Sequence, residues 1–435
     1  MSRPPFVYMI TQDIPVIDRR IILQAQSLQQ AGYKVRILTQ ASFEATQAIN
    51  LPAGDDNHEV EGIAVEYLAT RGHDPRYGWL YRLGSLGGAR GRHQANRAVT
   101  VLGVLHGYNT FRRLAPYWAA RAKADIYTAH DLDNLQVAML AARANSAPVV
   151  YDAHELYPEI SYPLVKLRKN YWTKVEARLL PKVAAASTVN EFIADEMAKR
   201  YHVPPPAVIY NATNPPPGFD LANPPNLLRE KLGLAADQRI ALFQGQLAPG
   251  RGLDKLVLAA SHLAPNIHLA FMGYGNLRPV LAKLAEAQGT SGRVHFLDAV
   301  PQSELIAHCA SADAGLIPYQ PVDLNNYYCS PNKLFDFIVA GLPIVANDLP
   351  FLHKMVVGNG LGEVATMDSP QQIAEAINKL LGNESRLRQT RSNLLKAAQV
   401  YNWTNESKKL LAIYQQVAER LRNNQLDFAD RQHSE

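Results

Sequence analysis

Cysteine is scarce in this sequence, and so are long uninterrupted apolar stretches. The 435 residues include only two cysteines, Cys309 and Cys329, which are too few for a disulfide framework or an all-cysteine zinc site. No run of about 18 uncharged apolar residues is present, so we expect no membrane-spanning helix. The first residues also lack the apolar core of a signal peptide. These absences predict a cytoplasmic protein in a reducing compartment.

Acidic residues are nearly absent from one segment, residues 71–123. This segment contains ten Lys and Arg residues and a single acid, Asp74, so its formal charge is +9. The whole chain has a net charge of +5, which leaves −4 for the remainder. On composition alone, such a basic region can bind nucleic acid or an anionic membrane, or it can be a solvated surface.

Apolar, β-branched runs alternate with helix-length segments along the whole chain. This alternation is typical of parallel sheets covered by helices, and six or seven strands in each half predict one doubly wound α/β domain apiece. The expected strands are 6–10, 35–39, 63–68, 125–129, 149–152, 186–189 and 208–210 in the first half, and 240–243, 267–272, 294–297, 314–317, 344–346 and 363–365 in the second.

A proline-rich segment, residues 211–225, separates the two halves. Its prolines cannot continue a helix or a central strand, so the segment is predicted to be a linker. We therefore place an amino-terminal Rossmann-like domain at residues 1–212 and a carboxy-terminal one at residues 213–403, facing a central cleft. A last helix, at about residues 404–421, is predicted to pack back on the first domain.

The strongest local signal for chemistry is the sequence Ser330-Pro331-Asn332-Lys333. Ser330 is a favourable N-cap, and Pro331 suits the first position of a helix. The free N–H groups of that helix terminus favour an anion such as phosphate. Lys333 adds a cation where a helix disfavours one unless an anion is nearby. The alternative interpretation is a well-capped helix with only a structural role.

A second signal is the glycine-rich turn that follows the apolar strand 240–243. Gly245 and Gly252 permit close backbone approach and positive φ angles, and Arg251 can hold phosphate oxygens with its planar guanidinium group. The turn matches neither the Walker A pattern nor the dinucleotide-binding fingerprint, and many α/β turns look like it. Two turns suited to anions in one sheet nevertheless favour a phosphate ligand at its carboxyl edge.

Histidine and carboxylate side chains follow two strands of the first half. Asp131 comes directly after His130, and Glu155 directly after His154, at the strand ends where sites form in such sheets. His130 can bind a polar ligand or transfer a proton. Each of these residues can alternatively cap a helix or hold a loop. Together with Asp152 they lack the tight spacing of metal ligands, so no metal site is predicted.

Taken together, these motifs resemble the glycosyltransferases of family 4, a retaining class with the GT-B fold. The resemblance covers almost the whole chain and rests on the order of the motifs, because each motif alone is unspecific. The matching sequences in the first half are Asp18-Arg19, Gly32-Tyr33-Lys34-Val35, Ala129-His130-Asp131 and Asp152-Ala153-His154-Glu155. In the second half they are the turn 245–252, Met272-Gly273-Tyr274-Gly275, Val294-His295-Phe296-Leu297, and residues 312–318, 330–346 and 359–362.

The resemblance implies roles for several of these residues. Arg251 would contact the diphosphate of a nucleotide-sugar donor, Asp336 would hold the ribose, and His130 would reach the transferred sugar. Two residues depart from the family pattern. Gln246 occupies the position of a second phosphate-binding Arg, whose charge Lys333 could supply, and Tyr328 that of the first acid in the Glu-x7-Glu motif. The other implied donor-binding residues are Gly245, Gln246, Gly252, Gly273, His295, Phe296, Ser330, Pro331 and Asn332, and the acceptor-side candidates are Asp131, His154 and Glu155.

The same resemblance implies a reaction. A sugar would pass with retention from a nucleoside-diphosphate sugar to a glycan or lipid-linked acceptor, in the synthesis of cell-surface polysaccharide or lipopolysaccharide. Arg251, Lys333 and the helix terminus would stabilise the leaving diphosphate, so neither a metal nor a cofactor is expected. The sequence leaves two alternatives open, a nucleotide-sugar 2-epimerase-like isomerase and a non-catalytic glycan-binding protein.

The basic segment falls in the acceptor-side domain of this scheme. It combines arginines with aromatic residues and amphipathic helical spacing, a combination that suits the surface of an anionic membrane. We therefore predict peripheral binding to the cytoplasmic face of a membrane through residues 71–123. A solvated basic surface is the alternative, and no recognition motif supports nucleic acid as a partner.

Overall fold

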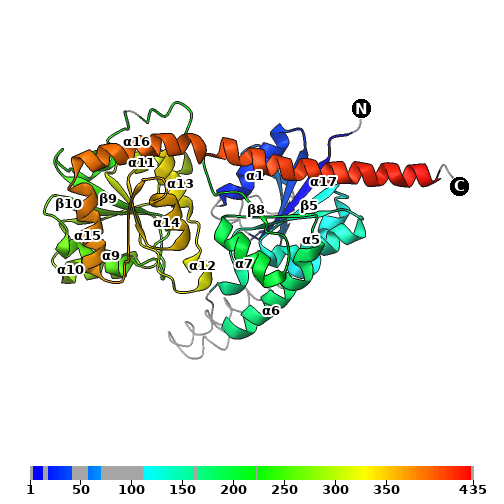
Figure 1. Cartoon of the computed structure of the whole chain (residues 1–435), viewed down its shortest axis with the longest axis horizontal. Coiled ribbons are helices and arrows are strands. Elements are labelled where there is room, and N and C mark those ends of the chain that lie inside the picture. The colour runs from blue at the N-terminus through cyan, green and yellow to red at the C-terminus, as the bar shows by residue number, and fades with distance from the viewer. Residues whose placement is uncertain are drawn as a thin grey trace, which may run out of the picture.

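The computed structural model describes residues 3–12, 18–41, 57–69, 111–160, 165–221 and 223–432. They form two lobes, each built around a mostly parallel sheet with helices on its faces (Figure 1). The expected two-domain α/β architecture is therefore confirmed. Within the basic segment, residues 71–110 lie outside the described part of the chain, and residues 111–121 are helical.

The first sheet has eight strands in the order β3-β4-β2-β1-β5-β6-β7-β8, and among them β3 and β4 pair antiparallel. The order reverses between β1 and β5, because β2 lies on one side of β1 and β5 on the other. The strands are β1 (Phe6–Ile10), β2 (Lys34–Ala41), β3 (Asn57–Val60), β4 (Ile63–Ala69), β5 (Ile126–His130), β6 (Val149–Ala153), β7 (Ala185–Thr188) and β8 (Ala207–Val208).

The second sheet has six parallel strands in the order β11-β10-β9-β12-β13-β14, and it reverses between β9 and β12. In sheets of this kind, ligands bind at the carboxyl ends of the strands beside the reversal point. The strands are β9 (Arg239–Gln244), β10 (Ile267–Met272), β11 (Val294–Leu297), β12 (Ala314–Ile317), β13 (Ile344–Asn347) and β14 (Gly362–Ala365).

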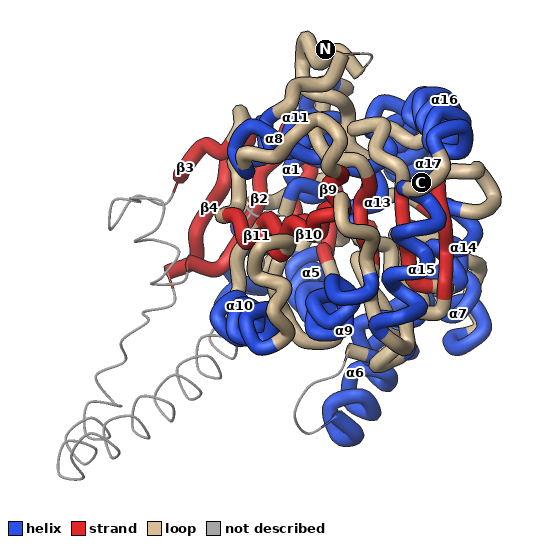
Figure 2. The backbone as a smooth tube through the Cα atoms, turned by 90° about the vertical axis from the view of Figure 1, so that its left-hand side faces the viewer, coloured by secondary structure: helices blue, strands red, loops and turns tan. Residues whose placement is uncertain are grey.

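Helices lie on the faces of both sheets, and in Figure 2 most of the red strands lie among blue helices, whereas β3 and β4 at the left form one edge of the first sheet. Besides residues 111–121, the first lobe contains α1 (Arg19–Gln30), α5 (Leu132–Ala144), α6 (Val165–Leu179) and α7 (Glu191–Tyr201), with short 3-10 turns at Tyr157–Glu159 and Leu180–Lys182. The second contains α8 (Leu227–Leu232), α9 (Leu253–Ala259), a 3-10 turn at Ala260–His262, α10 (Arg278–Ala287), α11 (Gln302–Ala310), α12 (Leu324–Tyr327), α13 (Asn332–Val339), α14 (Pro350–Val356), α15 (Pro370–Leu381) and α16 (Glu384–Val400).

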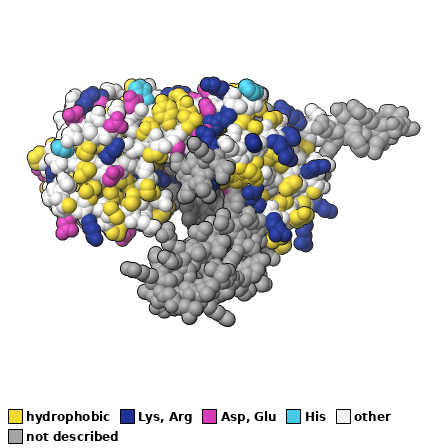
Figure 3. Space-filling model, turned by 90° about the horizontal axis from the view of Figure 1, so that it is seen from below, with side chains coloured by type: hydrophobic (Ala, Val, Ile, Leu, Met, Phe, Trp, Pro, Cys, Tyr) yellow, Lys and Arg dark blue, Asp and Glu magenta, His cyan; other side chains and the backbone are white. Residues whose placement is uncertain are grey.

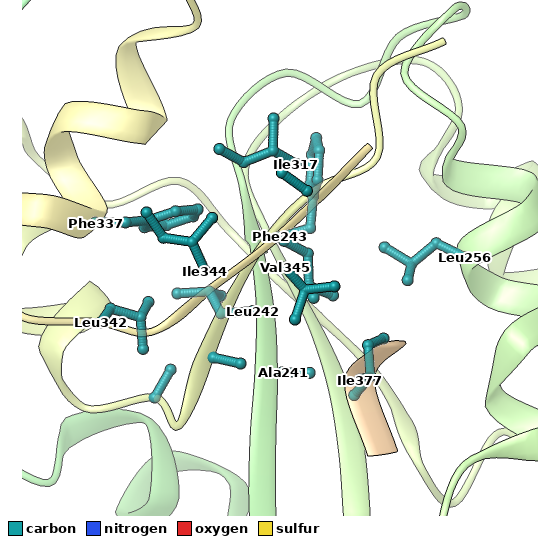
Figure 4. Packing of buried hydrophobic residues seen from close by; sticks show 14 of the residues in the cluster. Ala241, Leu242, Phe243, Leu256, Ile317, Phe337, Leu342, Ile344, Val345 and Ile377 are labelled. Atoms are coloured by element: carbon teal, nitrogen blue, oxygen red, sulfur yellow. The ribbon is translucent and has the colours of Figure 1, made fainter. Parts of the chain in front are cut away.

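The central strands of the second sheet are buried on both faces, which explains their continuous apolar sequences. Leu242 and Phe243 of β9 pack with Val345 of β13, and Phe337 of α13 covers the same core (Figure 4). Phe337 also approaches the backbone of β12 closely, because a side chain at Gly315 would collide with its ring. This packing fixes α13 beside the carboxyl ends of β9 and β12.

The last helix, α17 (Trp403–Gln432), follows α16 and crosses to the first lobe (Figure 1). Trp403 Nε1 donates to Ser27 Oγ of α1 at 2.9 Å, and the hydroxyl of Tyr414 lies 2.6 Å from Thr128 Oγ1 of β5. The helix is longer than the predicted 404–421. Although it has 30 residues, neither it nor any other described helix is apolar enough to cross a membrane.

Candidate functional site

Loops from the two lobes meet where strands of both sheets end. Asn325, after β12, binds the loop after β6 twice: its Oδ1 accepts from the Leu156 N–H at 2.9 Å, and its Nδ2 donates to Glu155 Oε2 at 3.0 Å. Asn190, after β7, donates to the carbonyl oxygen of Tyr328 at 2.7 Å. We call this region, formed by residues 18–20, 130–134, 152–156, 190, 244–252 and 318–336, the interlobe junction.

The start of α1 joins the two sides of the interlobe junction. Asp18 is the N-cap of this helix, and its Oδ2 lies 3.3 Å from His154 Nδ1 in the first lobe. The adjacent Arg19 donates from Nη1 to Asp336 Oδ1 in the second lobe at 2.8 Å. Two consecutive residues therefore connect the histidines at the end of the first sheet with helix α13.

Lys333 is a buried cation that has no hydrogen-bond partner among the described residues. It is 4% exposed, and its Nζ lies 3.6 Å from the ring centroid of Phe243 and 4.9 Å from that of Tyr319. Burial, reinforced by the positive charge of Arg251, lowers the pKa of this ammonium well below its usual range. A buried ammonium without a hydrogen-bonding partner is costly, so the surroundings of Lys333 favour an anionic ligand.

Arg251 places a second cation beside Lys333. Its guanidinium group donates a hydrogen bond to the Tyr319 hydroxyl and lies 4.8 Å from the centroid of the same ring. Burial raises the pKa of Tyr319 to about 12, so this phenol stays neutral and does not balance either charge. Asp336, the acid whose charge acts on Lys333, is already paired with Arg19. The interlobe junction therefore concentrates positive charge at the carboxyl edge of the second sheet.

Close backbone contacts hold the glycine-rich turn against the neighbouring loops. Gly252 has a φ of +67°, and a Cβ atom there would lie 2.3 Å from the carbonyl oxygen of Pro318. A Cβ at Gly273 would lie 2.0 Å from the carbonyl oxygen of Gly245. Neither position has room for a side chain, so the loops after β9, β10 and β12 form one compact support around the two cations.

The predicted N-cap role of Ser330 is wrong. Helix α13 begins at Asn332 with Pro331 as its N-cap, and no side chain caps it. The reason is the extended backbone of Pro331, with φ −69° and ψ 135°, which delays the start of the helix by one residue. The Ser330 hydroxyl is buried and has no hydrogen-bond partner in the described part of the chain, while its carbonyl oxygen accepts from Asn211 Nδ2 at 3.2 Å.

Asp336 is 1% exposed and both of its carboxylate oxygens are bound. Arg19 donates to one oxygen, and Gln244 Nε2, at the end of β9, donates to the other at 3.0 Å. Its expected contact with a ribose stays a prediction. Asn332, one turn earlier, is exposed and lines a small cavity with Arg19 and Trp403.

A buried ionic network lies beneath His130, centred on Asp152 at the end of β6. Arg20 donates to both carboxylate oxygens of Asp152, from Nε at 2.9 Å and from Nη2 at 2.7 Å. Gln24 and Ser187 add hydrogen bonds of 2.7 Å each. Burial alone would raise the pKa of Asp152, but the charge of Arg20 outweighs it and holds that pKa well below its usual range.

His154 connects this network to His130. Its Nε2 lies 3.1 Å from Asp152 Oδ2 and 3.1 Å from His130 Nδ1, and its Nδ1 faces Asp18 and Asp131 at 3.3 and 3.5 Å. Burial would lower the pKa of His154, but the charges of Asp131 and Asp18 and the bond to Asp152 raise it well above its usual value. Burial lowers the pKa of His130. His154 is therefore charged and His130 neutral near pH 7.

The predicted acceptor-side residues do not all stay together. Asp131 has φ +62° and accepts from the backbone N–H of His154 at 3.0 Å, so it belongs to the network under His130. Glu155 contacts Asn325 of the opposite lobe. This acceptor-side candidate therefore joins the two lobes.

Three described side chains, His130, Asp152 and His154, place potential metal ligands within 4.8 Å of one another. Their partners argue against this use. Asp152 already accepts from the guanidinium group of Arg20, and both nitrogens of His154 face carboxylate oxygens as a cation would. A metal ion would have to displace the guanidinium group of Arg20 and the protons of His154, so these three side chains do not fit a metal site.

His295 and Phe296 lie within β11, at the edge of the second sheet. The His295 ring stacks on His268 with centroids 5.2 Å apart, and Phe296 stacks on Phe271 at 5.1 Å. These side chains pack on the neighbouring strand β10, and no described contact joins them to Lys333. The expected approach of their backbone to a nucleotide base stays a prediction.

Several residues of the interlobe junction were missed as site candidates from sequence. One usable signal was present: Arg19 and Arg20 open a helix, where cations are unfavourable, and this placement indicates acidic partners elsewhere. Gln244 carries no such signal, because a glutamine at the end of a strand is ordinary. The residues missed in this way are Arg19, Arg20, Gln244 and Asn325, together with Gln24 just outside the junction.

Comparison with known families covers both lobes. The family described as "Glycosyltransferase Family 4" matches residues 17–215, and "Glycosyl transferases group 1" matches residues 226–399. This chain belongs to glycosyltransferase family 4. The solved structure of HepE from Anabaena, in complex with UDP and glucose, covers 96% of this family 4 chain and is itself covered completely, with a TM-score of 0.66 at 16% identity. This likeness shows the GT-B fold.

Other relatives match this family 4 protein less completely. A D-inositol 3-phosphate glycosyltransferase from Xylanimonas cellulosilytica is 28% identical over 230 residues, which are 51% of this chain and 52% of the relative. The chain thus spans about half the length of such curated relatives. The structure of WaaG, a glycosyltransferase involved in lipopolysaccharide biosynthesis, covers 94% of the chain and is 99% covered, with a TM-score of 0.60 at 17% identity.

The close contact at Gly252 in this family 4 site can be tested by comparing substitutions of two glycines. Gly252 and Gly289 both have a φ of +67°, but a Cβ at Gly289 meets nothing within 4 Å. Gly289→Ala should lower the free energy of unfolding by about 1–2 kcal/mol through backbone strain alone. Gly252→Ala should cost more, because it also pushes the loop at Pro318 away. Urea denaturation of both variants measures the difference, and equal losses would contradict the close contact.

Proposed function

We propose that this protein is a retaining glycosyltransferase that moves a sugar from a nucleoside-diphosphate sugar to a glycan or lipid-linked acceptor. The observation that carries the proposal is the buried ammonium of Lys333, which has no hydrogen-bond partner among the described residues and lies next to Arg251 at the reversal point of the second sheet. A diphosphate supplies the negative charge that this pair favours. HepE, which has the same fold, was solved with UDP and glucose.

The leaving diphosphate gains negative charge as the bond between sugar and phosphate breaks. Arg251 and Lys333 stabilise this charge in a region shielded from water, where such interactions are strongest. The reaction then requires neither a metal nor a cofactor. His130 reaches the transferred sugar from the first lobe, and the acceptor enters on that side.

The proposed acceptor belongs to cell-surface polysaccharide or lipopolysaccharide synthesis, at the cytoplasmic face of an anionic membrane. The helix 111–121 packs on α5 and α6, because Arg112 donates to Gln136 and to the Tyr171 hydroxyl. Leu114, Tyr117 and Tyr171 are 48%, 77% and 46% exposed. Figure 3 shows Lys and Arg side chains among hydrophobic ones on this lobe, at the right of the view. This mixture of basic and exposed apolar side chains supports binding to a membrane surface. WaaG, which has the same fold, is a glycosyltransferase involved in lipopolysaccharide biosynthesis, and this supports the proposed pathway.

Thermal unfolding with a panel of nucleoside diphosphates tests donor binding. A nucleoside diphosphate at 100 times its Kd should stabilise the protein by about 2.7 kcal/mol, because it binds only the folded chain. Arg251→Ala should remove this protection, since the guanidinium group holds the phosphate oxygens. Lack of protection of the unaltered protein by every nucleoside diphosphate would overturn the proposal.

Vesicle flotation tests the membrane surface. Arg113 is exposed on the helix 111–121, and Arg113→Glu should weaken binding to vesicles that contain an anionic phospholipid. A change of two charges at about 1 kcal/mol each corresponds to about 30-fold. The control is Lys283→Glu, an equal change at an exposed position of α10 in the second lobe, which should leave binding unchanged. An equal loss of vesicle binding in both variants would show that the helix 111–121 is not a specific membrane-binding surface.

A further inference from the structure

The Nδ1 atom of His130 has two possible hydrogen-bond partners, and the partner it takes decides whether the Nε2 atom is a hydrogen-bond donor or an acceptor. Its Nδ1 lies 3.1 Å from His154 Nε2 and 3.4 Å from Asp152 Oδ2. If Nδ1 donates to Asp152, Nε2 is a bare acceptor; if Nδ1 accepts from His154, Nε2 carries the proton. Because Nε2 is buried without a partner among the described residues, this choice decides what the ring offers to a sugar.

The surroundings of His154 require a proton on both of its ring nitrogens. Nε2 lies 3.1 Å from the carboxylate oxygen of Asp152, and Nδ1 lies 3.3 Å from Asp18 and 3.5 Å from Asp131. A bare nitrogen at either position would point its lone pair at a carboxylate oxygen, which is repulsive. The ring is therefore an imidazolium with Nε2–H directed between Asp152 and His130.

Asp152 has no capacity left for His130. Its Oδ2 already accepts from Arg20 Nε at 2.9 Å and from Gln24 Nε2 at 2.7 Å, and its Oδ1 accepts from Arg20 Nη2 and from Ser187 Oγ at 2.7 Å each. A carboxylate oxygen offers about two lone-pair positions. The 3.4 Å separation of His130 Nδ1 from Asp152 Oδ2 is also longer than its 3.1 Å separation from His154 Nε2.

We propose that the imidazolium of His154 donates its Nε2–H to Nδ1 of His130 and so fixes His130 as the tautomer with a proton on Nε2. His130 then offers a hydrogen-bond donor, not a base, to an oxygen of the transferred sugar. His154 is a positioning residue. The carboxylates of Asp18, Asp131 and Asp152 stabilise its positive charge, and the guanidinium group of Arg20 repels it. The sugar contact rests on the proposed function, but the tautomer is a property of the protein alone.

Nitrogen NMR of the full chain labelled with 15N-histidine tests the tautomer directly. The His130 signals are assigned by their loss in His130→Gln. We expect Nε2 of His130 to be protonated and Nδ1 to be bare at pH 7, and both nitrogens of His154 to be protonated. A proton on Nδ1 of His130, or a neutral His154, would overturn the proposal. This result is independent of any donor or acceptor.

Two substitutions at His154 separate positioning from a merely structural role. His154→Gln keeps an N–H donor for His130, whereas His154→Leu removes it. Loss of an orienting partner of a functional histidine costs about 10- to 100-fold in metal sites, so we expect a fall of this size in kcat for His154→Leu. His154→Gln should retain most of the kcat, and KM for the donor should change little in both.

Urea denaturation followed with a probe in the first lobe shows whether each His154 variant is folded, and protection by a nucleoside diphosphate shows that the donor site with Arg251 and Lys333 in the other lobe is intact. A folded His154→Leu protein with unchanged kcat would contradict the positioning role. If His154→Leu does not fold, the comparison of His154→Gln with the unaltered protein and the NMR result decide the matter. If the unaltered protein binds no nucleoside diphosphate, the proposed function fails, while the assignment of the tautomer stands or falls on NMR alone.

Discussion

Replacing Lys333 with Met is expected to make the protein more stable and to lower its transferase turnover strongly. Met keeps the length of the side chain and suits the rings of Phe243 and Tyr319, which contact the ammonium. The substitution removes a buried charge that has no hydrogen-bond partner among the described residues. We expect the free energy of unfolding to rise by about 1–3 kcal/mol. Turnover should fall about 100- to 1,000-fold, as when one donor to a developing charge is lost.

Lys255→Met is the matched control for this substitution. Lys255 lies in α9 of the same lobe and donates to Gln320 Oε1 at 2.7 Å, so its replacement removes a satisfied group. We expect Lys255→Met to be slightly less stable than the unaltered protein and to keep its turnover. Urea denaturation and a donor-turnover assay measure both variants. A Lys333→Met protein that is less stable, or that binds nucleoside diphosphate as tightly as the unaltered protein, would contradict the assignment of Lys333 as an anion-binding residue.

Asp152→Asn is expected to destabilise the first lobe strongly. Asn has the shape of Asp but no charge, so the guanidinium group of Arg20 and the imidazolium of His154 lose their shared buried partner. Breaking a buried ion pair by removal of one partner costs about 3–5 kcal/mol. We expect a loss of this size in the free energy of unfolding, measured by urea denaturation and followed with a probe in the first lobe.

The same change at an exposed ion pair provides the comparison. Asp298 pairs with Arg278, and its side chain is 86% exposed. Asp298→Asn should therefore change the free energy of unfolding by no more than about 0.5 kcal/mol. Similar effects at Asp152 and Asp298 would mean that the network under His130 does not contribute to stability.

The sheets could be predicted from sequence because buried parallel strands leave a strong local pattern. The apolar segments Phe6–Ile10 and Ile267–Met272 have the same bounds in the sequence analysis and in the structure. Strand β3, Asn57–Val60, was missed because it is short, polar and at the sheet edge. Its antiparallel pairing with β4 depends on a tight turn, which gives little hydrophobic signal.

The candidate site was predicted only where one short motif contains it. Arg251 lies in a recognisable glycine-rich turn and Lys333 in the first turn of a recognisable helix, and the structure brings them to one aromatic ring. The pairing of Arg20 with Asp152 links positions 132 residues apart, so it depends on how β1, β5 and β6 associate. No local pattern predicts such a pair. The start of α13 was wrong by one residue because the extended backbone of Pro331 delays the helix.

The most direct test of the account is release of nucleoside diphosphate from a panel of nucleotide sugars, with membrane extract as acceptor. We predict release that requires both the extract and one class of donor, and that is lost in Lys333→Met but not in Lys255→Met. Conversion of the donor to an isomer without acceptor would show an isomerase instead. Absence of turnover with every donor, in a protein that is folded, would contradict the proposed transferase.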